Sequence, residues 1–87
     1  MYNLYYTSQA QKDSARISQA GLRKKTIKLL EMIQADPYRF PPRYEMLKGD
    51  LKGAVSRRIN LQHRLVYQVL EEDKAIKVLR MWTHYGE

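Results

Sequence analysis

The stretch that decides the fold lies in the second half of the chain and reads Ala54-Val55-Ser56-Arg57-Arg58-Ile59-Asn60-Leu61-Gln62-His63-Arg64-Leu65-Val66-Tyr67-Gln68-Val69-Leu70. Residues 54–61 alternate between apolar and polar side chains, which is typical of a half-buried strand, and residues 64–70 are rich in β-formers. Residues 75–82 alternate again after Glu72-Asp73, a pair typical of a tight turn. We therefore expect three consecutive strands. His63 falls in the turn of the first hairpin, as a solvated or structural group rather than a catalyst.

The alternation in residues 54–61 decides which arginine faces which side of the sheet. We expect the apolar positions, Leu61 included, to pack inward, with Arg57 at the rim of their face and Arg58 on the other face. Arg64 opens the next strand, so the hairpin would bring two guanidinium groups together as a fork for phosphate oxygens. The alternative is a solvated charged surface, which these residues taken alone favour.

The N-terminal part of the chain predicts one strand and two helices. Residues 2–7 are rich in aromatic side chains and predict a short strand. The capping-box spacing of Ser8 and Gln11 predicts the start of a helix, which Gly21 interrupts. Apolar residues at steps of three and four predict a second helix over residues 22–35.

Residues 37–53 contain three prolines and two glycines and predict a long irregular segment. A segment of this length in a small domain is usually functional, or else it hides a short strand. The order β-α-α-β-β-β predicts an α+β fold, with two N-terminal helices packed on one face of an antiparallel sheet. Because 87 residues supply only one core, we expect a single domain over residues 1–87.

The composition limits the classes of function that the chain can have. Sixteen Lys and Arg against nine Asp and Glu give a formal net charge of +7, and seven cations against two acids lie between Arg39 and Arg64. A small basic domain is attracted to polyanions such as RNA. Without cysteine there are no disulfides, thiolate metal sites or cysteine nucleophiles, and the apolar runs are too short to span a membrane. We expect no cofactor and no metal.

Metal-free cleavage of RNA needs a base for the ribose 2′-hydroxyl, an acid for the leaving 5′-oxygen and cations for the phosphorane. Glu45 could act as the base and His84 as the acid. The cations would be Lys48, Arg58 and Arg64. Each residue also has a plainer interpretation: Glu45 as an ion-pair partner of the basic loop, His84 as an ordinary terminal group, and Tyr85 as a core residue rather than a ring that stacks on a base.

Four segments of the chain together resemble a known family. They are Glu45 to Gly53, Ser56 to Asn60, His63 to Tyr67 and the pair His84-Tyr85. In this order they look like the YoeB/Txe family of bacterial toxins, within the RelE-like group, and the run S-R-R-I-N-x-x-H-R-L-V-Y is the most distinctive part.

The chain departs from the pattern of that family at three places. Ala54-Val55 stands where aromatic residues are frequent, Trp82 where a basic residue is usual, and Gly86-Glu87 follows the terminal His-Tyr pair. The first change affects packing more than chemistry. The second bears on substrate contacts and the third on the placement of Tyr85.

The resemblance implies a microbial-ribonuclease-like (RelE-like) fold and an endoribonuclease that cuts mRNA in the ribosomal A site. By position, Glu45 resembles the general base, His84 the general acid and Arg64 the phosphate-stabilising arginine. The supporting RNA contacts would come from Lys48, Arg58 and Tyr85. The implied partners are the ribosome, mRNA and an acidic YefM/Axe-like antitoxin in the cytoplasm, and a homodimer stays open.

Two other classes of function remain open from the sequence. The chain could be a basic RNA-binding module without catalysis, in which Glu45 is only a structural partner of Arg58 and Arg64. It could also be an interaction protein whose basic surface binds an acidic partner, an antitoxin included. Salt-dependent RNA binding without a 2′,3′-cyclic phosphate product would distinguish the first from an enzyme.

Overall fold

The computed structural model describes residues 1–82 of the chain. Within that range the elements follow the order β1 (Asn3–Tyr6), α1 (Ser8–Gln19), α2 (Arg23–Ala35), β2 (Tyr44–Met46), β3 (Val55–Arg58), β4 (Arg64–Leu70) and β5 (Ala75–Arg80). Two short 3-10 helices, Gly49–Leu51 and Glu71–Asp73, fill the connections before β3 and before β5. None of the helices in this range is long and apolar enough to cross a membrane.

The strands form one sheet in the order β1-β5-β4-β3-β2. The pairs β2–β3, β3–β4 and β4–β5 are antiparallel, as expected, whereas β1 pairs with β5 in parallel, with Asn3 opposite Ala75. The sheet is therefore mixed rather than wholly antiparallel. No tight turn joins these two strands, so local sequence does not set their relative direction.

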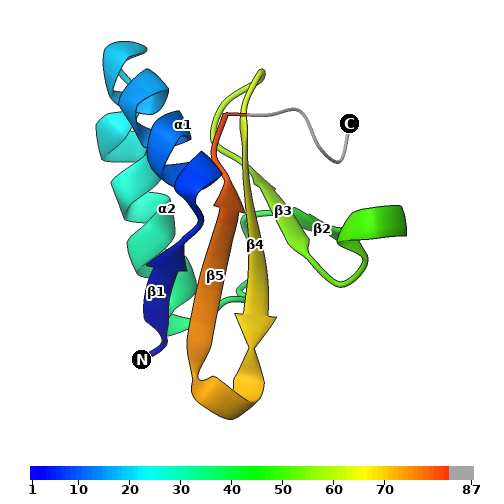
Figure 1. Cartoon of the computed structure of the whole chain (residues 1–87). Helices are drawn as coiled ribbons and strands as arrows, with labels where there is room; N and C mark the ends of the chain where they lie inside the picture. Colours follow the sequence, from blue (N-terminus) through cyan, green and yellow to red (C-terminus); the bar gives the residue numbers. More distant parts are fainter. Residues whose placement is uncertain (83–87) are drawn as a thin grey trace.

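The two helices cover one face of the sheet (Figure 1). Buried apolar side chains of both layers meet there: Ala10, Ile17, Ile33, Val55, Leu65, Tyr67, Ile76 and Val78. The expected α+β architecture, with two helices on one face, is confirmed. Helix α1 begins at Ser8 as predicted, but the residue that caps it is Thr7, whose Oγ1 accepts a hydrogen bond from the amide of Ala10 at 3.0 Å.

Two local expectations are resolved by the hairpin and by the segment before it. The irregular segment contains a short strand, β2, in which Tyr44 lies opposite Arg57 and Met46 opposite Val55. Strand β3 ends at Arg58, so Leu61 falls in the turn and is 81% exposed. The expectation that Leu61 packs inward was wrong, because the alternating pattern continues past the last ladder pair.

Candidate active site

The sheet face away from the helices brings four polar side chains to one side. Directly opposed residues of an antiparallel pair share a face, and so do residues two apart on one strand. Glu45 lies opposite Ser56, and Arg58 lies opposite Arg64. Since Ser56 and Arg58 are two apart on β3, all four residues face the same side, whereas Val55 and Leu65 belong to the core beneath the helices.

A hollow of about 390 Å³ opens among these residues. Its lining comes from the loop before β2 and from strands β2, β3 and β4: Pro42, Arg43, Tyr44, Glu45, Arg57, Arg58 and Arg64. Four arginines and one carboxylate thus surround one concave space. Arg58 and Arg64 lie opposite each other across the hairpin, as expected, and Glu45 lines the same hollow. Their use as a fork for phosphate oxygens stays a prediction.

Arg64 is only 4% exposed, although it lies on the open face of the sheet. Its Nη2 lies 3.6 Å from Oε1 of Glu45, and its Nη1 donates a 3.5 Å hydrogen bond to Oγ of Ser56. The side chain of Glu45 is 37% exposed, and Arg58 is exposed as well. The hollow therefore combines a guanidinium held in place with a carboxylate and a second guanidinium that a ligand can reach.

Arg57 has a different environment from the one its sequence suggested. It was expected at the rim, yet it is fully buried. Its Nε donates to the Tyr67 hydroxyl at 2.8 Å, its Nη1 to the carbonyl of Pro42 at 2.7 Å, and its Nη2 to that of Arg39 at 2.7 Å and, more weakly, Pro37 at 3.2 Å. A proline-rich loop offers few N–H groups for its own carbonyls, and one guanidinium with five donors replaces them.

Arg57 and Tyr67 together fix the loop that leads into Glu45. The Tyr67 hydroxyl donates a 2.6 Å hydrogen bond to the carbonyl of Pro37, and the guanidinium of Arg57 lies 4.6 Å from the ring centre of Tyr44. Burial raises the pKa of Tyr67 to about 12, although the hydrogen bond from Arg57 acts in the opposite direction. The phenol therefore stays protonated and keeps donating at neutral pH. Sequence analysis missed the role of Arg57 in holding the loop, because Arg57 and Arg58 are adjacent residues of the same type and no local pattern distinguishes them.

The remaining predicted residues fall outside this cluster or outside the described range. Lys48 is exposed, precedes the 3-10 helix Gly49–Leu51 and is not among the residues that line the hollow. His84 and Tyr85 lie outside residues 1–82, so their assigned roles stay predictions. Within residues 1–82 no three His, Cys, Asp or Glu side chains gather closely enough to hold a metal ion.

His63 and Trp82 are described, and they contact each other. Their rings stack with centroids 3.7 Å apart and planes 18° apart. His63 is 8% exposed, so the structural interpretation of this turn residue holds and the solvated one does not. Trp82, at the position where the resemblance leads one to expect a basic residue, stacks on His63 in the β3–β4 turn.

A two-helix layer on a five-stranded sheet, with a cationic hollow on the open face, defines a RelE-like toxin fold. Solved structures agree. A YoeB/ParE toxin from Agrobacterium tumefaciens superposes with a TM-score of 0.85 at 29% identity, over 95% of this chain and 99% of that one. The YoeB–YefM toxin–antitoxin complex from Staphylococcus aureus contains a chain that superposes with a TM-score of 0.79 at 34% identity, over 98% and 99% of the two chains.

Sequence comparison defines the family more closely. Toxin YoeB of Synechocystis is 42% identical over 57 residues, which span 66% of this chain and 64% of that toxin. Residues 4–85 match the family described as the YoeB-like toxin of bacterial type II toxin–antitoxin systems. The chain belongs to this family.

Proposed function

We propose that this protein is an endoribonuclease that cleaves mRNA in the A site of translating ribosomes and so stops protein synthesis. The observation that supports this most directly is the hollow in which Glu45 lies 3.6 Å from Arg64 while Arg58 stands opposite Arg64 on the neighbouring strand. A carboxylate and two guanidinium groups around one space are what the attack of a 2′-hydroxyl on a phosphodiester requires.

In this mechanism Glu45 removes the proton of the 2′-hydroxyl, whose oxygen then attacks the adjacent phosphorus. The bond from phosphorus to the 5′-oxygen breaks, which leaves a 2′,3′-cyclic phosphate and a free 5′-hydroxyl. Arg64 and Arg58 bind the non-bridging oxygens as their charge grows, and Arg64 does so from a position already fixed by Ser56. His84 supplies the proton to the leaving 5′-oxygen.

The same hollow suits control by an antitoxin. The S. aureus relative was solved as a YoeB–YefM complex. The formal net charge of this chain is +7. Charge complementarity gives a cationic site both a fast encounter with acidic partners and selectivity for them. We propose that an acidic, YefM-like antitoxin binds this protein over the hollow and blocks RNA. Co-expression of the antitoxin should abolish toxicity, and undiminished toxicity would contradict this part of the proposal.

The test is cleavage of a defined message, mapped by primer extension with and without ribosomes. Wild-type protein should cut only when ribosomes are present. Glu45→Gln, Arg64→Ala and His84→Ala should each lower the rate by about 10²–10⁴-fold, the usual contribution of acid–base and electrostatic groups. Lys25→Ala is the matched control, because it removes one positive charge from the exposed part of α2.

The outcomes separate the candidate functions. If the three site variants cleave like the wild type and like Lys25→Ala, the assigned site is wrong. If the wild type binds RNA in a salt-dependent way but yields no cyclic phosphate, the protein is an RNA-binding module without catalysis.

A further inference from the structure

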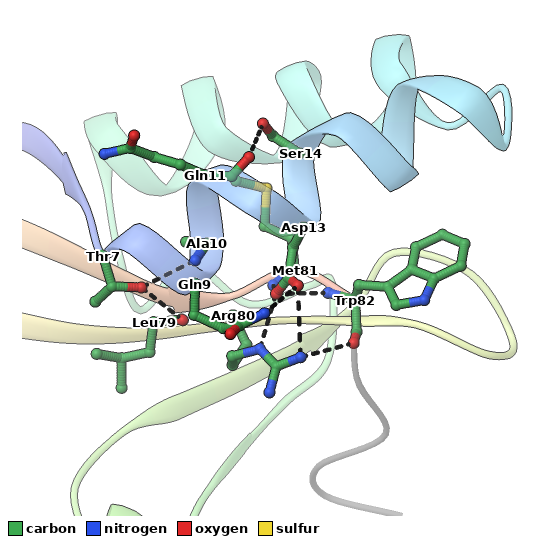
Figure 2. A network of polar contacts seen from close by, with 10 residues as sticks. All are labelled: Thr7, Gln9, Ala10, Gln11, Asp13, Ser14, Leu79, Arg80, Met81 and Trp82. Carbon is green, nitrogen blue, oxygen red and sulfur yellow. Dashed lines mark hydrogen bonds and ion pairs between the residues drawn. The ribbon is translucent and has the colours of Figure 1, made fainter.

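A buried carboxylate on α1 holds the end of β5. Asp13 is 1% exposed, and its Oδ2 accepts hydrogen bonds from Nε of Arg80 at 2.8 Å, from the amide of Met81 at 3.0 Å and from the amide of Trp82 at 3.3 Å. Its Oδ1 accepts from Nε2 of Gln9 at 3.1 Å. Figure 2 shows these donors converging on the one side chain.

The Asp13 contact lies where strand β5 leaves the sheet. Strand β5 ends at Arg80, so the amides of Met81 and Trp82 lie beyond the sheet and need other acceptors. Asp13 accepts from both of them. Arg80 adds a bridge, since its Nη2 lies within 3.4 Å of Oδ1 of Asp13 and also donates to the carbonyl of Trp82 at 3.3 Å.

The turn between β3 and β4 also holds Trp82. The indole of Trp82 stacks on His63, which directly precedes Arg64 in the chain. The backbone of Trp82 is thus fixed by α1, and its ring by the turn between β3 and β4. Two residues further along the chain comes His84, the residue to which we assign the general acid.

We propose that Asp13 is a positioning residue for the cleavage reaction: by fixing the backbone at Met81 and Trp82, it sets the point, stacked on the turn residue that precedes Arg64, from which the chain continues to His84. The inference rests on the proposed function. It assigns to α1, which contributes no side chain to the hollow, a share in the placement of the acid. A buried carboxylate is costly unless hydrogen bonds compensate it, and here all the compensating donors except Gln9 belong to the segment that it positions.

The charge state of Asp13 suits this role. Burial acts to raise the pKa of Asp13, but hydrogen bonds from Arg80, from the amide of Met81 and from Gln9 outweigh it and hold the pKa below its ordinary value. The carboxylate is therefore ionised at neutral pH and accepts from every donor that points at it.

The test combines fluorescence and kinetics on the full chain. Trp82 is the single tryptophan, so the emission reports on the surroundings of this one residue. Asp13→Asn should shift the emission to longer wavelength and lower its anisotropy. It should also reduce kcat for ribosome-dependent cleavage by about 10–100-fold with KM changed less than threefold, because the loss lies in orientation rather than RNA binding. Ser14→Ala, next to Asp13 but bonded only within α1, is the control and should change neither.

A double-mutant cycle distinguishes positioning from general damage. In a His84→Ala background, Asp13→Asn should cause no further loss of rate, because the group through which it acts is gone. Equal fold-losses in both backgrounds, or unchanged Trp82 emission in Asp13→Asn, would overturn the inference while leaving the proposed function intact. A His84→Ala protein as active as the wild type would instead overturn the assignment of the acid, and this inference with it.

A second variant keeps the test valid if Asp13→Asn does not fold. Arg80→Lys retains the positive charge but cannot donate to Asp13 and to the carbonyl of Trp82 from a planar fork. It should give a smaller loss in kcat and a smaller red shift of the same kind. A folded Arg80→Lys protein with wild-type kcat and emission would also overturn the inference.

Discussion

Arg57 and Arg58 are neighbours in the chain, but their side chains point to opposite faces of β3. Arg57 points to the core face of β3, is fully buried and donates to the Tyr67 hydroxyl and to loop carbonyls. Arg58 points to the open face, is exposed and stands opposite Arg64 at the hollow. The comparison shows that the strand face, rather than the residue type, decides whether an arginine supports the loop or faces the hollow.

The largest effect is expected on the open face. Arg64→Lys keeps the charge but loses the paired donors that suit phosphate oxygens, and we expect a loss in kcat of about 10²–10³-fold. The midpoint of thermal unfolding should change by only a few degrees. Single-turnover cleavage on ribosomes and a thermal melt together measure both quantities. A large fall in the melting midpoint with normal cleavage would reverse the assignment of the two faces.

A substitution on the core face should lower the stability of the protein. Arg57→Lys leaves carbonyls of the loop before β2 without donors, and we expect the free energy of unfolding to fall by about 3 kcal/mol. Denaturant titration measures this change, with Arg58→Lys as the matched control one residue away, which should be near neutral. Equal stability of the two variants would show that the hydrogen bonds of Arg57 do not hold the loop.

Tyr67→Phe sharpens the same comparison through pH. The variant loses the hydrogen bonds to Pro37 and Arg57, which should cost about 1–2 kcal/mol of unfolding free energy near neutral pH. The pKa of Tyr67 is raised from 10.0 to about 12 in the folded protein, so the folded state retains this proton more firmly. Its stabilising contribution is complete below pH 10 and is lost as pH rises towards 12.

Denaturant titrations of Tyr67→Phe and wild type between pH 7 and pH 11.5 measure that loss. The stability difference between the two proteins should shrink above pH 10. A difference that stays constant across this range would contradict the assigned proton.

The smallest effects concern the exposed cations. Arg58→Ala should weaken RNA binding severalfold and lower the slope of log affinity against log salt by about 0.7, the value for one contact to a single strand. Lys48→Ala, which removes a cation that does not line the hollow, should change the affinity less than Arg58→Ala does. Binding measured at three salt concentrations separates them, and a larger effect of Lys48 would place RNA along the 3-10 helix Gly49–Leu51.

The sequence predicted those parts of the fold that local pattern governs. The two helices, the β3–β4 hairpin and the opposition of Arg58 and Arg64 follow from periodicity and from a short turn. Strand β2 was only one of two alternatives, because three residues between a proline-rich loop and a 3-10 helix carry too little pattern. The parallel pairing of β1 with β5 depends on contacts between distant segments, which local pattern does not record.

The candidate site was predictable to a similar extent. Taken alone, Glu45 and Arg64 favoured an ion pair and a solvated surface, and they became candidates through their combination with the other groups and through the family resemblance. Arg57 did not, since its role depends on carbonyls of the loop before β2 that fold against it. Asp13 was also missed, because a single acidic residue on a helix resembles any solvated charge until its donors are seen at the end of β5.

The pairing of Asn3 with Ala75 has a consequence for folding during synthesis on the ribosome. Strand β5 lies between β1 and β4, so β1 of a nascent chain has no partner strand in this sheet until residues 75–80 have left the exit tunnel. Long-range pairings of this kind form late, after the entropy of closing a long loop has been overcome. The donors of residues 80–82 that meet Asp13 emerge with the end of β5 and directly after it. An unfinished chain therefore carries the hollow-lining segments without the strand that joins the N-terminal strand to the rest of the sheet.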